Sequence, residues 1–334
     1  MRVRFSLVAA LALACAIPSA PVLADDTLSA THVFPASLIY ARSFLEYVKK
    51  ANDAGKGVFN IQVRGGPEAI GMMEQPGAVR SGVVDMVYSA CAFYAAVVPE
   101  CDALSASSID GPTARKNGGT ELLNQIHQKR MGTYLLGWVD SGIRFSLWST
   151  KEPKFDSSGH LDIRGFKVRG NPIYNAFLTN YLGAQVINLN SPELYTALER
   201  GTVDITAWTQ IGAMDLNWDR FLKYRILPDF FSTDLVILVN LKKWNALAPK
   251  TREILQRVAI EHEVSSLQAL QALWKTEEAE LAKRGLKTLS QSPEASKKFV
   301  AGARAASLQR MKERMEKSGG VENYDKVVQL FTPG

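Results

Sequence analysis

The sequence predicts an α/β protein of two domains, with a ligand cleft between the domains and a helical C-terminal segment. Three observations predict this arrangement. Strand-like runs alternate with helical stretches in the first part of the chain, which is typical of a sheet covered by helices. Two later runs, 143–149 and 235–239, have the composition of strands that cross from one domain to the other. After Trp244 the chain is rich in Ala, Glu, Gln and Lys, as packed helices are.

The first 24 residues have the composition of an export signal. Arg2 and Arg4 precede an apolar run, Phe5–Ile17, and small residues lead up to Ala24. The run has about 13 residues, fewer than the roughly 20 that span a bilayer, so we expect cleavage after about Ala24 rather than a membrane anchor. A lipid anchor on Cys15 is the alternative, although the residues before Cys15 match a lipoprotein signal poorly.

The remaining chain, about 310 residues long, is sufficient for two domains. Loss of Arg2 and Arg4 lowers the formal net charge from +6 to +4, and the remaining Lys and Arg residues are dispersed among Asp and Glu. We therefore expect no nucleic-acid partner.

Two cysteines, Cys91 and Cys101, remain after cleavage, in a compartment where disulfides form. We favour a disulfide across a short helix. Two buried free thiols are the alternative, because so short a separation restricts the Cα spacing that a disulfide needs.

Two successive strand–helix–strand units open the first domain. Their strands are expected at 28–34, 58–63 and 83–88, and their helices at 36–51 and 73–81. Ligands of wound sheets bind at the C-terminal ends of the strands. We therefore expect His32 and Tyr88 to lie at the cleft.

The crossings set the expected domain boundaries. Residues 25–140 and about 235–265 are assigned to the first domain and residues 141–234 to the second, with hinges near Ser141 and Ser232. Helices within 245–320 are expected to pack across both domains.

The most informative segment runs from residue 165 to residue 208. A short strand, 166–169, ends at Arg169, and Asn171 with the proline after it provides an N-cap and a first helical residue for a helix to about Leu182. A helix N-terminus favours an anion, and a guanidinium fork fits a carboxylate. Arg169 and Asn171 are therefore candidate ligand contacts, although an arginine at a strand end is more often a surface ion-pair partner.

A second unit of the same form follows. It has a strand at 185–189, Ser191 as the expected N-cap, and a strand at 203–205. Trp208 comes just after this strand, so we expect it at the same cleft. A place in the core is an equal alternative for this tryptophan.

This stretch resembles the signature of the solute receptors of TRAP (tripartite ATP-independent periplasmic) transporters, the DctP-like family. In that family G-x-K-x-R precedes Leu-Gly-Ala and then S/P-E-hydrophobic-Y-x-A-L-x-x-G-x-V/I-D. The matching residues are Gly165, Lys167, Arg169, Leu182-Gly183-Ala184, Glu193-Leu194-Tyr195, Ala197-Leu198, Gly201 and Val203-Asp204. The resemblance implies the two-domain periplasmic binding protein fold, a periplasmic location, and transfer of a small organic acid to integral membrane permease subunits.

The resemblance also assigns roles to single residues. Arg169 is expected to hold the ligand carboxylate, and Arg144 matches a second arginine that supports the first or contacts the far side of the ligand. Glu193, Tyr195 and Asp204 are expected to have structural roles outside the site.

Departures from the family pattern predict the ligand. Where dicarboxylate and sialic-acid receptors carry polar ligand contacts, this sequence has Trp208, Met72, Ala90 and Phe93. An apolar, aromatic-walled pocket suits a monocarboxylate with an apolar or aromatic body, because further polar groups of a ligand would lack partners there.

A subgroup that binds 2-oxo and 2-hydroxy monocarboxylates has Glu-Trp at this place and holds a cation. Its metal-binding glutamates align with Ala207 and Ser232 here, so we expect neither a metal nor a cofactor. A 2-oxo or 2-hydroxy acid remains a candidate ligand.

An enzyme is not expected. The four histidines, His32, His127, His160 and His262, are scattered, and no nucleophile elbow, zinc motif or phosphate-binding loop occurs. The alternatives are a C4-dicarboxylate receptor, a receptor of an ABC-type or tricarboxylate transporter, and a ligand-sensing receptor for a histidine kinase. We expect a monomer.

Overall fold

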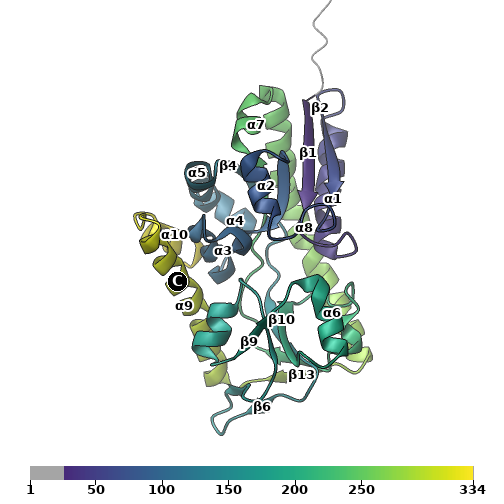
Figure 1. Cartoon of the computed structure of the whole chain (residues 1–334), viewed down its shortest axis with the longest axis vertical. Coiled ribbons are helices and arrows are strands. Elements are labelled where there is room, and N and C mark those ends of the chain that lie inside the picture. Colours follow the sequence, from purple (N-terminus) through teal and green to yellow (C-terminus); the bar gives the residue numbers. More distant parts are fainter. Residues whose placement is uncertain (1–25, 334) are drawn as a thin grey trace, which may run out of the picture.

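The computed structural model describes residues 26–333. The expected export signal, its cleavage site and Cys15 lie outside these residues. The molecule is elongated, with one large sheet in each half (Figure 1). This confirms the predicted α/β class and the helical C-terminal segment.

The first sheet is mixed, with strand order β2-β1-β3-β12-β4. Strand β1 pairs in parallel with β2 and β3, and β12 is antiparallel to both β3 and β4. Every residue of β3 and β12 is buried, as expected of central strands covered on both faces. The strands are β1 (Asp26–His32), β2 (Phe59–Gly65), β3 (Met86–Ala90), β4 (Thr133–Trp138) and β12 (Leu235–Asn240).

Helices surround this sheet. Helix α1 buries Tyr40, Phe44, Tyr47 and Ala51, which recur at helical spacing along one face. The helices of this half are α1 (Ile39–Ala54), α2 (Gln75–Ser81), the 3₁₀ helices η1 (Cys91–Tyr94) and η2 (Pro99–Cys101), α3 (Asp102–Ala106), α4 (Gly111–Lys116) and α5 (Gly119–Met131).

The second sheet has strand order β13-β11-β5-β10-β8-β9. Strand β5 is antiparallel to β10 and β11, and β8 is parallel to β9 and β10. The strands are β5 (Phe145–Ser149), β8 (Val168–Gly170), β9 (Val186–Asn188), β10 (Ile205–Thr209), β11 (Tyr224–Leu227) and β13 (Lys287–Ser290). A separate hairpin pairs β6 (Lys154–Phe155) with β7 (Leu161–Asp162).

Two helical segments of this half differ from the sequence expectations. The helix expected after Asn171 is a turn followed by a π-helix, Phe177–Tyr181, where the hydrogen bonds span one more residue than in an α-helix. Helix α6 (Ser191–Glu199) begins at Ser191, so the N-cap is Asn190 and not Ser191 as expected. The Asn190 N–H donates to Glu193 Oε2 at 2.7 Å, as in a capping box. A 3₁₀ turn, η4 (Trp218–Arg220), completes the half.

The chain passes to the second sheet after β4 and returns before β12. The two connecting segments lie side by side: Thr233 N–H donates to the carbonyl oxygen of Ile143 at 3.0 Å, and Arg144 pairs with Ser232 in an antiparallel bridge. Backbone hydrogen bonds thus join the outgoing and returning chains.

The C-terminal segment contacts both halves. It contains α7 (Leu241–Ala246), α8 (Pro249–Lys283), α9 (Pro293–Lys317) and α10 (Tyr324–Phe331). Within α8, Glu263 binds Arg115 of the first half, whereas the Trp274 ring lies 4.4 Å from the Arg225 guanidinium of the second half. Strand β13, which the sequence analysis did not predict, adds an edge to the second sheet between α8 and α9. None of the helices between residues 26 and 333 is both long and apolar enough to cross a membrane.

Candidate functional site

A cavity is lined by residues from both halves of the molecule. It is narrow, with about 30 Å³ available to the centres of water molecules. Most of its wall is apolar or aromatic. The lining residues are Phe34, Tyr40, Met72, Ala90, Phe93, Phe145, Arg169, Asn171, Ile173, Tyr174, Ser191, Trp208, Thr209, Thr233, Asp234 and Leu235.

Arg169 lies in β8, and only 1% of its surface is exposed. Its Nε donates to the carbonyl oxygen of Leu189 at 3.0 Å, and its Nη1 donates to Tyr174 Oη at 2.7 Å. A longer contact of 3.4 Å joins Nη1 to Thr206 Oγ1. These bonds fix the orientation of the guanidinium, while Nη2 donates to no other described residue.

The charge of Arg169 is not balanced by a carboxylate. Within residues 26–333, no Asp or Glu oxygen lies within ion-pair distance of its guanidinium. Burial lowers the pKa of Arg169 below its usual range, and the Tyr174 hydroxyl partly offsets this effect. A buried cation without a partner is costly, and an anionic ligand would remove much of that cost.

Trp208 lies in β10, and its ring is next to the Arg169 guanidinium in the cavity wall. Its ring centre is 5.9 Å from the guanidinium carbon and 4.7 Å from the ring of Trp218, which it meets edge to face. The Trp208 Nε1–H is buried and has no hydrogen-bond partner among the described residues. Trp208 therefore contributes an aromatic wall and an unused donor.

Asn171 begins the turn after β8, and its hydrogen bonds hold that turn. Its Oδ1 accepts from the Ile173 N–H at 3.2 Å, and its own N–H donates to Asn175 Oδ1 at 2.6 Å. It lines the cavity together with Met72 and Phe93. The structure thus gathers Arg169, Asn171, Trp208, Met72 and Phe93 around one space.

His32 and Tyr88 do not line this cavity, contrary to expectation. His32 is 2% exposed, and its Nδ1 lies 2.7 Å from the carbonyl oxygen of Phe34. The Tyr88 hydroxyl donates to the buried Asp140 carboxylate, and its ring stacks on Phe44 with centres 5.3 Å apart. His32 is the last residue of β1, whereas Tyr88 lies in the middle of β3 and not at its end as expected, and both side chains point into the core of the first half.

Arg144 is also absent from this cavity. Its Nη1 donates to the carbonyl oxygen of Ser107 at 3.0 Å, and its side chain lines a separate hollow beside Arg304 of α9. The expected pairing of Arg144 and Arg169 around one carboxylate is therefore not seen. Arg144 lies in the outgoing connecting segment, whose main chain pairs with the returning segment at Ser232. From there its side chain reaches Ser107 and not the cavity.

Sequence reasoning missed several lining residues. Tyr174 orients the Arg169 guanidinium, and Asp234 places a buried carboxylate in the wall. Tyr40 Oη and Ser191 Oγ are buried without a hydrogen-bond partner among the described residues. Of these residues, only Tyr174 could have been suspected from the sequence, because it lies in the turn that follows Arg169.

The structural roles expected of Glu193 and Asp204 agree with their contacts. Glu193 bonds the backbone at the start of α6. Asp204 accepts from the Lys167 N–H at 3.0 Å and pairs with Lys151 Nζ at 2.8 Å. Neither residue lines the cavity.

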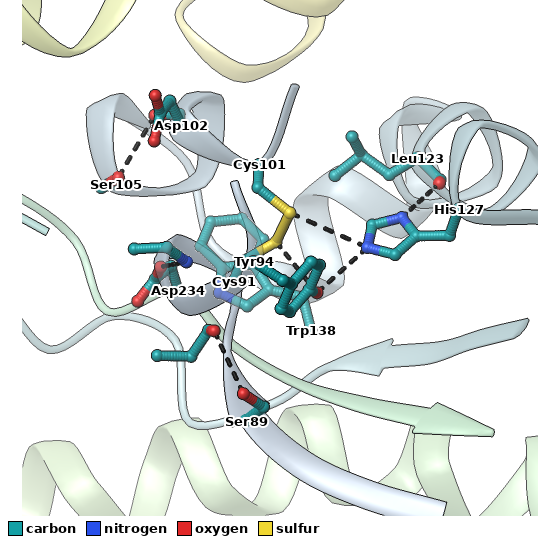
Figure 2. The surroundings of a disulfide bond; sticks show 12 residues. Ser89, Cys91, Tyr94, Cys101, Asp102, Ser105, Leu123, His127, Trp138 and Asp234 are labelled. Atoms are coloured by element: carbon teal, nitrogen blue, oxygen red, sulfur yellow. Dashed lines mark hydrogen bonds between the residues drawn. A yellow bond between two sulfur atoms is a disulfide. The ribbon is translucent and has the colours of Figure 1, made fainter. Parts of the chain in front are cut away.

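Cys91 and Cys101 form a disulfide, with their Cα atoms 5.4 Å apart, beside His127 and Tyr94 (Figure 2). Within residues 26–333, Cys91, Cys101 and His127 are the one group of three potential metal-binding side chains close enough to share an ion. Metal binding requires thiolates, and a disulfide supplies none. This cluster is therefore part of the protein core.

The sequence of this protein matches the family DctP, described as "Bacterial extracellular solute-binding protein, family 7", over residues 30–314. The match covers most of the chain, and it includes the segment that carries Arg169. The chain belongs to this family of TRAP-transporter solute receptors. Like the other members of the DctP family, it is a receptor and not an enzyme.

Known DctP-type receptors and their relatives share the fold at low sequence identity. A monocarboxylate 2-oxoacid-binding periplasmic protein from Nostoc sp. is 25% identical over 67% of this chain, and the match spans 63% of that relative's length. The crystal structure of DctP7, a Bordetella pertussis receptor binding pyroglutamic acid, is similar with a TM-score of 0.76 at 16% identity, covering 91% of this chain and 99% of that one. A Bordetella bronchiseptica TRAP solute-binding protein with calcium and picolinate in its active site has a TM-score of 0.74 at 20% identity, with 91% of each chain covered.

Proposed function

We propose that this DctP-family receptor binds a small monocarboxylate with an apolar or aromatic body. The observation that carries the proposal is the buried guanidinium of Arg169, which has no carboxylate partner and lies in an otherwise largely apolar cavity. Hydrogen bonds from a guanidinium to a carboxylate are strong because both groups are charged, and Nη2 of Arg169 has no acceptor among the described residues, so it can donate to a ligand carboxylate.

The charge of the cavity favours one carboxylate over two. Arg169 is the single cation among the described lining residues, and Asp234 contributes a negative charge to the same wall. A second ligand carboxylate would lack a cation and would lie in apolar surroundings, which is costly. A C4-dicarboxylate is therefore the less favoured ligand.

Binding is proposed to follow a hinge cycle. The space in the cavity suffices for only a few water molecules, so the ligand enters when the two halves separate. Closure then places its carboxylate against Arg169 and its body against Trp208 and Phe93. The closed form is recognised by the integral membrane permease subunits. The receptor acts in the periplasm as a monomer after removal of the signal at about Ala24.

Several relatives support an organic-acid ligand. Pyroglutamate, picolinate and 2-oxoacids are named for three of them, and each has a single carboxylate. Because the identity to these relatives is low, the preferred acid has to be inferred from the lining residues of this chain.

The test is a thermal-shift screen of the mature protein against organic acids, followed by calorimetry on the acids that stabilise it. We expect branched and aromatic monocarboxylates to raise the melting temperature more than succinate or malate do. Arg169→Met should weaken binding about 100-fold or more. Arg144→Met, which removes a partly buried arginine outside the cavity, is the matched control and should change affinity little. A preference for succinate and malate, or unchanged binding by Arg169→Met, would overturn the proposal.

A further inference from the structure

Asp234 is a second charged group in the wall that contains Arg169. It precedes β12 at the point where the chain returns to the first sheet, and 1% of its surface is exposed. Its Oδ2 accepts from the Ala92 N–H at 2.7 Å, and its carbonyl oxygen accepts from the Cys91 N–H at 2.8 Å. Figure 2 shows it close to the disulfide, at the start of η1.

The second carboxylate oxygen of Asp234 is unused. Among residues 26–333, no side chain and no further backbone N–H of another residue donates to Oδ1, and no Lys, Arg or His pairs with the carboxylate. Several other buried acids have a cationic partner. Asp102 pairs with Arg310, Glu263 with Arg115 and Glu100 with Arg130. Glu277 is likewise buried with one hydrogen bond, from the Gly212 N–H, but it does not line the cavity, so Asp234 is the one carboxylate of this kind among the described cavity residues.

Asp234 and Arg169 do not neutralise one another. Both line the cavity, but their charged atoms are farther apart than an ion pair allows. Burial raises the pKa of Asp234 to about 6, which shows the cost of leaving this carboxylate without more donors. A ligand lying between the two residues could satisfy both.

We propose that the natural ligand carries a hydrogen-bond donor (an N–H, an O–H or an ammonium group) that Asp234 Oδ1 accepts while Arg169 holds the ligand carboxylate. This inference rests on the proposed function. It restricts the ligand to hydroxy, amino or cyclic-amide monocarboxylates and disfavours 2-oxo acids, whose keto oxygen can only accept. Asp234 is thus a specificity residue, and it also repels a second carboxylate.

The experiment uses pairs of acids that differ in one donor, measured by calorimetry on the full mature chain. Pyroglutamate is compared with its lactone analogue 5-oxotetrahydrofuran-2-carboxylate, and 2-hydroxy-4-methylpentanoate with 4-methylpentanoate. In each pair whose members bind, we expect the donor-bearing acid to bind at least about tenfold more tightly, because its partner leaves Oδ1 buried and unbonded.

The variant Asp234→Asn sharpens the test. Its side-chain oxygen can still accept from the Ala92 N–H, while its NH₂ group would face the cavity in place of Oδ1. We expect the tenfold preference to disappear or reverse, with Arg169 dependence retained. Equal binding of both acids by the wild type, or an unchanged preference in Asp234→Asn, overturns the inference while the carboxylate receptor stands. If no acid binds in an Arg169-dependent way, the proposed function itself fails, and the inference with it.

Discussion

Arg310 and Asp102 form a two-point ion pair, with Nη2 2.7 Å from Oδ1 and Nε 2.8 Å from Oδ2. The remaining nitrogen of Arg310, Nη1, donates to the carbonyl oxygen of Pro172 at 2.6 Å. Asp102 begins α3 in the first half, and Pro172 follows β8 in the second. Arg310 of α9 therefore ties the two halves together beside Asn171 of the cavity.

Arg310→Met should destabilise the protein strongly. It leaves Asp102 buried with only the more exposed Arg314 as a cation, and removal of one partner of a buried pair costs about 3 kcal/mol. Urea unfolding would measure the change. Arg257→Met, which breaks an exposed pair with Glu261, is the control and should cost less than about 1 kcal/mol. Equal losses in the two variants would contradict the role of Arg310.

The shape of the Arg169 side chain should matter as much as its charge. Arg169→Lys keeps a cation but loses the bonds from Nε to Leu189 and from Nη1 to Tyr174. We expect an affinity loss of about 30-fold or more for the acid that binds best, because the ammonium lacks the planar fork by which Leu189 and Tyr174 hold the charge in position for the ligand. Calorimetry at constant pH would measure it, and a loss below threefold would show that charge alone is sufficient.

Tyr174→Phe tests the orienting bond by itself. It removes the hydroxyl that accepts from Arg169 Nη1 while the ring keeps its place in the core. The expected loss of affinity is about three- to tenfold, smaller than for Arg169→Lys, since one neutral partner of a charged donor is lost. A loss larger than that of Arg169→Lys would indicate that the Tyr174 hydroxyl contacts the ligand directly.

The sequence alone could place Arg169 because its signal is local. A strand that ends before Asn171 and a proline fixes the position of the arginine, and the family pattern adds its role. Met72, Phe93 and Trp208 are predicted as departures from the polar ligand contacts of other family members, and the structure brings all three to the cavity.

The misplaced residues show what local patterns leave open. The end of a strand predicts the edge of the sheet, but not the direction of a side chain there. The strand that carries Tyr88 also continues to Ala90, so Tyr88 lies in its middle, and it points to Asp140, a partner more than fifty residues away in the sequence. Asp234 gave no signal, because its importance depends on Ala92 and Arg169, which only the folded chain brings near it. The π-helix after Asn171 likewise lacks a distinct sequence period.

Glu277 should make stability depend on pH. Its Oε2 accepts from the Gly212 N–H at 3.1 Å. Burial, helped by the nearby Asp215, raises the pKa of Glu277 from 4.5 to about 7. The folded protein therefore holds more protons than the unfolded chain between these values, so the free energy of unfolding falls as the pH rises through this window.

Glu277→Gln keeps an acceptor for Gly212 and removes the titration. Relative to the wild type, we expect it to gain up to about 3 kcal/mol of stability between pH 4.5 and pH 8. Urea unfolding at both pH values would measure this difference. Glu253→Gln, on the exposed part of the same helix, is the control and should show a much smaller one. A gain that is equal at both pH values would exclude titration of Glu277 as its cause.

The Cys91–Cys101 disulfide should stabilise the segment that carries Phe93 of the cavity wall. It closes a loop with a sequence separation of 10, for which chain entropy predicts a stabilisation of about 3 kcal/mol. Replacement of both cysteines by alanine should lower the free energy of unfolding by about this amount and weaken ligand binding less than tenfold, because η1 is also held by the bond from Ala92 to Asp234. Wild type treated with dithiothreitol should unfold at the same urea concentration as the double variant. If the variant and the untreated wild type unfolded together, the loop would be held instead by the contact of its Tyr94 with His127.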